Sequence, residues 1–124
     1  MSDVTTTVDT YLAMWNEDDP GRRAELIEQA WAPDGRYADP LLEADGHDAL
    51  SAMVESVHAQ FPGHRFRRVS AVDTHHEQCR FAWELVAPDG TITVAGIDIG
   101  VLGTDGRLRM IAGFFGDVPE QAAA

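Results

Sequence analysis

The sequence contains no lysine, so all nine of its permanently cationic side chains are arginines. Without lysine, neither Schiff-base chemistry nor the lysine of a phosphate-binding P-loop is available. Twenty-one acidic residues bring the net charge to -12. A charge of this sign repels phosphate backbones and anionic membrane surfaces. We therefore expect neither nucleic acid nor a membrane as a partner.

Cysteine and long apolar runs are also scarce. Cys79 is the single cysteine, which excludes an internal disulfide and is typical of a reducing compartment. No apolar run approaches the ~20 residues that cross a bilayer, and the N-terminal segment lacks the basic and apolar regions of a secretion signal. We therefore expect a cytoplasmic protein. The length of 124 residues and the hydrophobic content of 44% predict a single domain over 1–124.

Helical periodicity dominates the first half of the chain. Apolar residues recur every three to four positions in 4–16, 20–31 and 48–61, which predicts three helices. The sequence APDG at 32–35 has the proline and glycine of a turn, and a short extended segment follows at 36–39.

The second half of the chain changes to the two-residue periodicity of strands. Strands are predicted over 66–74, 79–85, 91–102 and 107–115, with hairpin turns at APDG 87–90 and GTDG 103–106. Helices followed by an antiparallel meander favour the α+β class. We predict a cone-like α+β barrel in which three N-terminal helices pack on a curved, mainly antiparallel sheet and enclose a pocket.

One acidic residue interrupts the apolar strand predicted over 91–102. Asp98 stands between Ile97 and Ile99, far from either turn. Burying an unpaired carboxylate costs free energy, and such groups commonly have a raised pKa that keeps them neutral. A neutral carboxyl can donate a hydrogen bond to a developing oxyanion. The alternative is a structural aspartate that accepts hydrogen bonds or pairs with an arginine, and the spacing leaves both interpretations open.

Asp39 and Tyr11 also have two interpretations each. Asp39 precedes Pro40, which is typical of an Asx turn, but the same position could expose a catalytic base to the mouth of a pocket. Tyr11 lies on the apolar stripe of the first predicted helix, either as a core aromatic or with its hydroxyl in the cavity as an oxyanion donor. The residues alone favour the turn and the core.

Three segments carry a resemblance to a known family: TYLAMWNEDD at 10–19, APDGRYADPL at 32–41 and AGIDIGVLGTDGRLRMIAGFFG at 95–116. They resemble the nuclear transport factor 2-like (NTF2-like) superfamily, and their motifs are most similar to the ketosteroid isomerases and to SnoaL-like proteins. Those isomerases build their site from a tyrosine of the first helix, the aspartate of an Asp-Pro step and an aspartate of the penultimate strand. The same order of residues here identifies Tyr11, Asp39 and Asp98.

The resemblance implies proton transfer on a small apolar carbonyl compound or a steroid-like ligand, without a cofactor. Asp39 would be the base, and Tyr11 and Asp98 would form the oxyanion hole. We predict Trp15, Trp83 and Phe115 as substrate-binding residues. The resemblance also implies a homodimer, which the apolar outer face of strands 78–115 supports.

Three alternatives remain from the sequence. A SnoaL-like polyketide cyclase would use Asp39 or Asp98 as an acid or base, and an epoxide hydrolase-type enzyme would combine both with Arg80. A non-catalytic dimeric ligand-binding domain would use the pocket alone.

The remaining reactive side chains give weaker signals. His75 and His76 are adjacent, so on a strand they face opposite ways, and we expect no metal site, although one of them could serve as an acid or base. Cys79 shares its strand face with Phe81 and is predicted to be a core residue.

Overall fold

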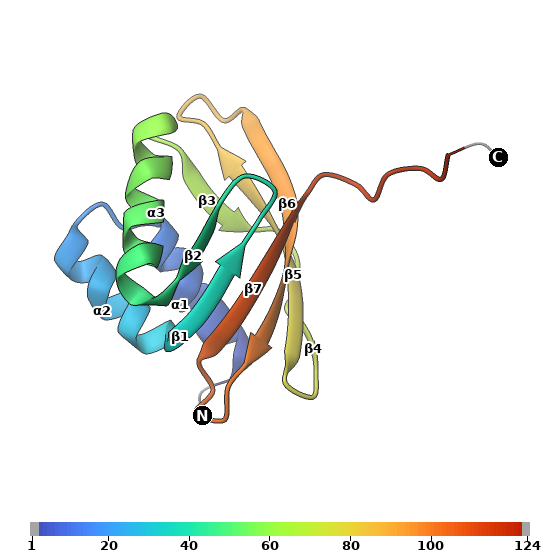
Figure 1. Ribbon diagram of the computed structural model, residues 1–124. Coiled ribbons are helices and arrows are strands. Elements are labelled where there is room, and N and C mark those ends of the chain that lie inside the picture. The colour runs from blue at the N-terminus through green and yellow to red at the C-terminus, as the bar shows by residue number, and fades with distance from the viewer. Residues whose placement is uncertain (1–2, 123–124) are drawn as a thin grey trace.

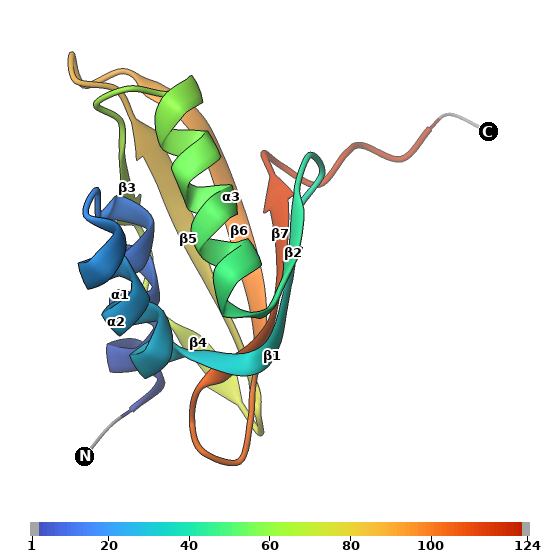
Figure 2. The ribbon, with the colours of Figure 1, turned by 60° about the vertical axis from the view of Figure 1, so that its left-hand side comes forward.

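The computed structural model describes residues 3–122 and shows three helices packed on one face of a curved seven-stranded sheet (Figure 1, Figure 2). The sheet bends around the helices without closing into a complete barrel (Figure 2). The predicted α+β cone with a curved sheet is confirmed, and the sheet stays open on one side.

The helices begin and end close to the predicted positions: α1 covers Val4–Asn16, α2 covers Pro20–Ala30 and α3 covers Gly46–Gln60. Asp3 and Asp19 are the N-caps of α1 and α2, and each carboxylate accepts a hydrogen bond from the backbone N–H three residues later. Local capping chemistry therefore sets where these two helices start.

The sheet is mixed, because β1 runs parallel to β7 while all other paired strands are antiparallel. Its order is β2-β1-β7-β6-β5-β3, and β4 pairs with β5 beside this path. The strands are β1 (Trp31–Ala38), β2 (Glu43–Asp45), β3 (Arg65–Arg68), β4 (Asp73–His75), β5 (Gln78–Val86), β6 (Ile92–Leu102) and β7 (Leu108–Phe115).

The turn predicted at 32–35 is wrong, because this segment lies inside β1. The register of β1 on β7 shifts between Trp31 and Arg36. Such an irregularity accommodates Pro33, which has no N–H for a regular ladder. The unpredicted β2 completes a hairpin with the end of β1. Both features depend on pairing with other strands, which local turn chemistry does not report.

The strand predicted over 66–74 is divided into β3 and β4. Between them, Ser70 turns its side chain towards the neighbouring strand, and its hydroxyl accepts a hydrogen bond of 2.8 Å from the backbone N–H of Ala82. A side chain thus replaces a backbone acceptor, and the regular ladder is interrupted at this point.

The long hairpins β5–β6 and β6–β7 follow the prediction closely. Their turns place Gly90 and Gly106 at φ of +89° and +83°, a conformation that other residues rarely adopt. Along β5, the alternating residues Cys79, Phe81, Trp83 and Leu85 are buried against the helices. No helix within residues 3–122 has the length and apolarity needed to cross a membrane.

Candidate functional site

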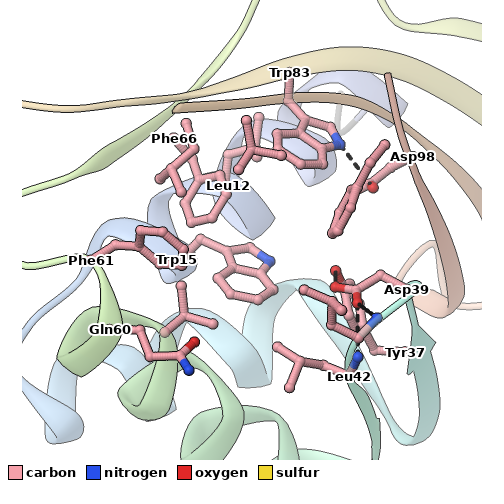
Figure 3. Close-up of a pocket in the computed structure, with 15 residues that line it drawn as sticks. Leu12, Trp15, Tyr37, Asp39, Leu42, Gln60, Phe61, Phe66, Trp83 and Asp98 are labelled. Carbon is pink, nitrogen blue, oxygen red and sulfur yellow. Dashed lines mark hydrogen bonds between the residues drawn. The ribbon is translucent and has the colours of Figure 1, made fainter. Parts of the chain in front are cut away.

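A cavity of about 320 Å³ lies between the helices and the inner face of the sheet (Figure 3). It brings together the predicted Asp39, Asp98, Trp15, Trp83 and Phe115, which all lie on its lining. The other lining residues are Leu12, Tyr37, Leu41, Leu42, Val57, Gln60, Phe61, Phe66, Leu85 and Val94. Most of the wall is therefore apolar.

Asp98 occupies the middle of β6 and is 4% exposed. Its Oδ1 accepts a hydrogen bond of 3.0 Å from the indole Nε1 of Trp83, and its Oδ2 accepts one of 3.4 Å from the hydroxyl of Tyr11. Burial raises the pKa of Asp98 from 3.8 to about 7; the Asp39 carboxylate adds to the rise, while the two hydrogen bonds oppose it. The carboxyl is therefore largely protonated below pH about 7.

Tyr11 lies behind Asp98, as seen from the cavity, and is not among the residues that line it. Its ring stacks on Trp31 with centroids 5.8 Å apart and meets the edge of Phe81. Burial, followed by the charge of Asp98, raises the pKa of the Tyr11 hydroxyl well above its ordinary value. The structure thus differs from the interpretation that this hydroxyl points into the cavity, because Tyr11 does not line the cavity and contacts Asp98, which does.

Asp39 follows the last residue of β1 and is only partly buried. Its Oδ1 accepts hydrogen bonds of 2.8 Å from the backbone N–H groups of both Leu41 and Leu42, so the carboxylate closes an Asx-type turn. Its Oδ2 accepts a hydrogen bond of 2.6 Å from the hydroxyl of Tyr37. Asp39 is therefore a turn residue and a cavity residue at the same time.

Tyr37 is the site residue that the sequence reasoning missed. It lies two positions before Asp39, and residues two apart in an extended segment share a face, so this spacing could have revealed it. Burial, followed by the nearby Asp98, raises the pKa of the Tyr37 hydroxyl above its ordinary range. The group stays protonated and donates to Asp39.

Gly113 of β7 marks the point where these groups converge. It pairs directly with Asp98 across the β6–β7 ladder. A Cβ atom at this position would lie 3.0 Å from Asp98 Oδ1, 3.3 Å from the Cβ of Asp39 and 3.5 Å from the hydroxyl oxygen of Tyr37. Two carboxyl-bearing residues and a phenol thus border one small volume that lacks a side chain: Tyr37 and Asp39 come from the end of β1, and Asp98 comes from β6.

The SnoaL-like domain model matches residues 8–111 of the chain, which is most of its length and includes both aspartates. The chain belongs to the SnoaL-like family. No curated protein is significantly similar to this SnoaL-like chain.

Solved structures support the assignment at two levels of similarity. A protein from Agrobacterium tumefaciens strain C58, provisionally named an isomerase of the SnoaL-like family, is 42% identical with a TM-score of 0.86, over 90% of this chain and 96% of that one. An NTF2-like protein of unknown function from Exiguobacterium sp. 255-15 is 22% identical with a TM-score of 0.69, over 91% and 100%. A protein from Jannaschia sp. CCS1, provisionally named a SnoaL-like polyketide cyclase, is 17% identical with a TM-score of 0.66, over 93% and 89%. The last two similarities show the fold alone.

Several other candidates of this SnoaL-like chain lie away from the cavity. Arg80 is exposed and pairs with Asp73 at 2.8 Å, so it cannot complete the set with two aspartates that an epoxide hydrolase-type site requires. His75 and His76 are exposed at the turn between β4 and β5. Cys79 is a buried core residue, as predicted.

Proposed function

We propose that the protein transfers a proton to and from a carbon next to a carbonyl group, with Asp39 as the base and Asp98 as the hydrogen-bond donor to the oxygen. One observation carries the proposal: two carboxyl groups of one apolar cavity have different burial and different hydrogen-bond partners. Asp39 is partly exposed and accepts three hydrogen bonds from neutral donors, whereas burial of Asp98 favours the neutral acid. Pairs of acids in unlike environments are suited to acid–base chemistry.

In the proposed first step, the substrate C–H bond breaks and the proton moves to Asp39. The electron pair of that bond shifts towards the carbonyl, whose oxygen becomes an enolate. Return of the proton to the same carbon gives exchange, and return to a conjugated position gives isomerisation. The carbonyl is itself the electron sink, so this chemistry requires no cofactor.

In the same step, the protonated Asp98 donates its O–H to the enolate oxygen. The indole N–H of Trp83 only donates, and the Tyr11 hydroxyl is also placed to donate, so the acidic O–H of Asp98 stays available to a ligand. A preorganised donor of this kind accounts for roughly 10²–10³ in rate in other enzymes. Tyr11 and Trp83 are then positioning residues for Asp98, and Tyr37 is the positioning residue for Asp39.

The test is exchange of the methyl protons of 2-acetylnaphthalene in D₂O, followed by proton NMR. We expect Asp39→Asn to slow the enzymatic exchange by roughly 10²–10⁴, the usual contribution of a general base. Asparagine keeps an oxygen for the two turn N–H groups, so the hairpin should persist. Asp45→Asn removes the same charge from an exposed position outside the cavity and should leave the rate unchanged. Equal rates for wild type and Asp39→Asn would refute the mechanism.

A Δ5-3-ketosteroid distinguishes the isomerase from its nearest rival. Formation of the conjugated ketone, dependent on Asp39, would extend the activity to isomerisation. Proton exchange without isomerisation would instead favour a cyclase-type reaction, in which the enolate attacks a second carbonyl of the same molecule. Ligand binding without any exchange would indicate the non-catalytic alternative.

A further inference from the structure

The charges on the cavity wall are all of one sign. The lining includes the carboxyl groups of Asp39 and Asp98, and none of the nine arginines or five histidines, which all lie within the described residues 3–122. A bound anion would therefore meet a carboxylate without any cationic partner nearby. Like charges at short range in a poorly solvated site repel strongly.

The charge of Asp39 is stabilised without being cancelled. Its partners are the hydroxyl of Tyr37 and two backbone N–H groups, which are all neutral. A carboxylate paired with arginine would form a neutral unit, whereas this one keeps its full negative charge at the cavity. The net charge of the whole chain, -12, adds a field of the same sign.

The rest of the wall is suited to an apolar body that carries rings. The ring centroid of Phe66 lies 5.0 Å from that of Trp15 and 5.7 Å from that of Trp83, with interplanar angles of 56° and 66°, so three aromatic side chains form a continuous apolar wall. The polar groups of Asp39 and Asp98 lie at one end of the cavity, and the neutral Gln60 lies at the other (Figure 3). The volume of about 320 Å³ is at the lower end of the range of ligand pockets.

We propose that this site selects an uncharged ketone attached to an apolar ring system and rejects the carboxylate of the same shape. The inference rests on the proposed function, because it places the carbonyl oxygen at the acidic end. There an uncharged oxygen can accept a hydrogen bond from Asp98. A carboxylate would bring a full negative charge towards Asp39.

The test compares two ligands of nearly equal size, 2-acetylnaphthalene and 2-naphthoate, which differ by a methyl group in place of an anionic oxygen. Binding is followed by quenching of tryptophan fluorescence, since Trp15 and Trp83 line the cavity, and by isothermal titration. At about pH 6, where naphthoate is an anion and Asp98 is largely protonated, we expect the ketone to bind at least about tenfold more tightly.

Two variants identify the source of the discrimination. Asp39→Asn should bring the two dissociation constants to within about threefold, because it removes the charge that the anion meets. Asp45→Asn, the same change at an exposed site away from the cavity, should leave the ratio of the naphthoate and ketone dissociation constants as in wild type. Circular dichroism verifies that both variants fold. If Asp39→Asn does not fold, Asp39→Ser removes the same charge, keeps an oxygen for the turn N–H groups and should narrow the difference between the two dissociation constants in the same way.

Tight binding of naphthoate, absence of ketone binding, or equal effects of Asp39→Asn and Asp45→Asn would each overturn the inference. Failure of the proposed function has a different signature. If the protein prefers the ketone but exchanges none of its methyl protons, the proposed ligand class is supported and the proposed proton transfer is refuted. If the protein exchanges the ketone's protons and binds naphthoate equally well, the proton transfer is supported and the charge selection is refuted.

Discussion

At the scale of single residues, Asp98 shows how a site can be useful and destabilising at once. The side chain is buried and accepts hydrogen bonds from Trp83 and Tyr11, both neutral. Ionisation in this setting is unfavourable, and the same penalty keeps the acid protonated near neutral pH. The property that would make Asp98 a donor therefore reduces the stability of the fold at higher pH.

The stability of an Asp98→Asn variant should reveal this penalty. The pKa of Asp98 is about 7 in the folded chain, above its ordinary value of 3.8, so the folded chain binds this proton more tightly than the unfolded chain does. The stability that this proton contributes is fully present below the unfolded-state pKa and is lost as the pH rises through the folded-state pKa. Between about pH 4 and about pH 8, wild type should lose on the order of 3 kcal/mol relative to the variant. Urea unfolding at both pH values measures the difference.

A control and a contradicting result are available for this prediction. Asp45→Asn should show no comparable change with pH, because Asp45 is exposed. A constant difference between wild type and Asp98→Asn across this range would mean that the folded chain does not favour the protonated acid.

Asp39 shows what one residue's neighbours in sequence can and cannot reveal. The Asp-Pro step predicted a turn, and Asp39 does close one through Leu41 and Leu42. The spacing of Tyr37 and Asp39 places both side chains on one face, but nothing local reports that this face lines a cavity. The cavity role was inferred through the resemblance, and its catalytic part stays a proposal.

At the scale of elements, the β6–β7 hairpin places Gly113 opposite Asp98. The missing side chain leaves space beside the acid, and β1 delivers Tyr37 and Asp39 to the same space because it lies parallel to β7. The register of two strand pairs thus assembles the site, and a side chain at position 113 would fill it.

A Gly113→Ala variant should lose catalysis more than stability. Its Cβ would lie 3.0 Å from Asp98 Oδ1, which forces the carboxyl to move. Small displacements of catalytic groups can cost up to about 10² in rate, and we expect at least a tenfold loss of ketone proton exchange. NMR exchange measures the loss, and thermal unfolding measures the stability.

The matched control is Gly100→Ala, whose Cβ would be equally crowded, at 3.0 Å from the sulfur of Cys79. Gly100 lies two residues from Asp98 along β6, but the three atoms nearest to its added Cβ belong to the core residues Cys79, Ile111 and Leu108 and not to either acid. Overpacking there should cost about 1–3 kcal/mol of stability with ketone exchange retained in the folded fraction. If both variants lose exchange in parallel with stability, Gly113 has no special relation to the site.

At the scale of the whole molecule, the outer face of the sheet exposes large apolar side chains. Ile97 and Phe114 are direct partners across β6 and β7 and are 42% and 57% exposed, and Ile99 and Met110 lie on the same face. Exposed apolar patches of this kind mark interaction surfaces. We propose that this face forms the homodimer that the family resemblance implies.

A Phe114→Glu variant tests this proposal. A charge at the centre of the patch should convert a dimer to a monomer, because an unpaired carboxylate would be buried on association. Light scattering after size-exclusion chromatography measures the mass. Val118→Glu, at an exposed position after β7, is the control and should keep the mass of wild type. A wild-type protein that remains monomeric at high concentration would refute the proposal.

The sequence by itself determined the three helices, the two long hairpins, the alternation along β5 and the acid within an apolar strand, because each depends on residues a few positions apart. Tertiary structure alone decided that Tyr11 stands behind Asp98 and that Gly113 leaves space beside it. It also decided the irregular course of β1. These features depend on the hydrogen-bond register between strands far apart in the chain. Local spacing does not encode that register, and the register is what assembles the polar end of the cavity.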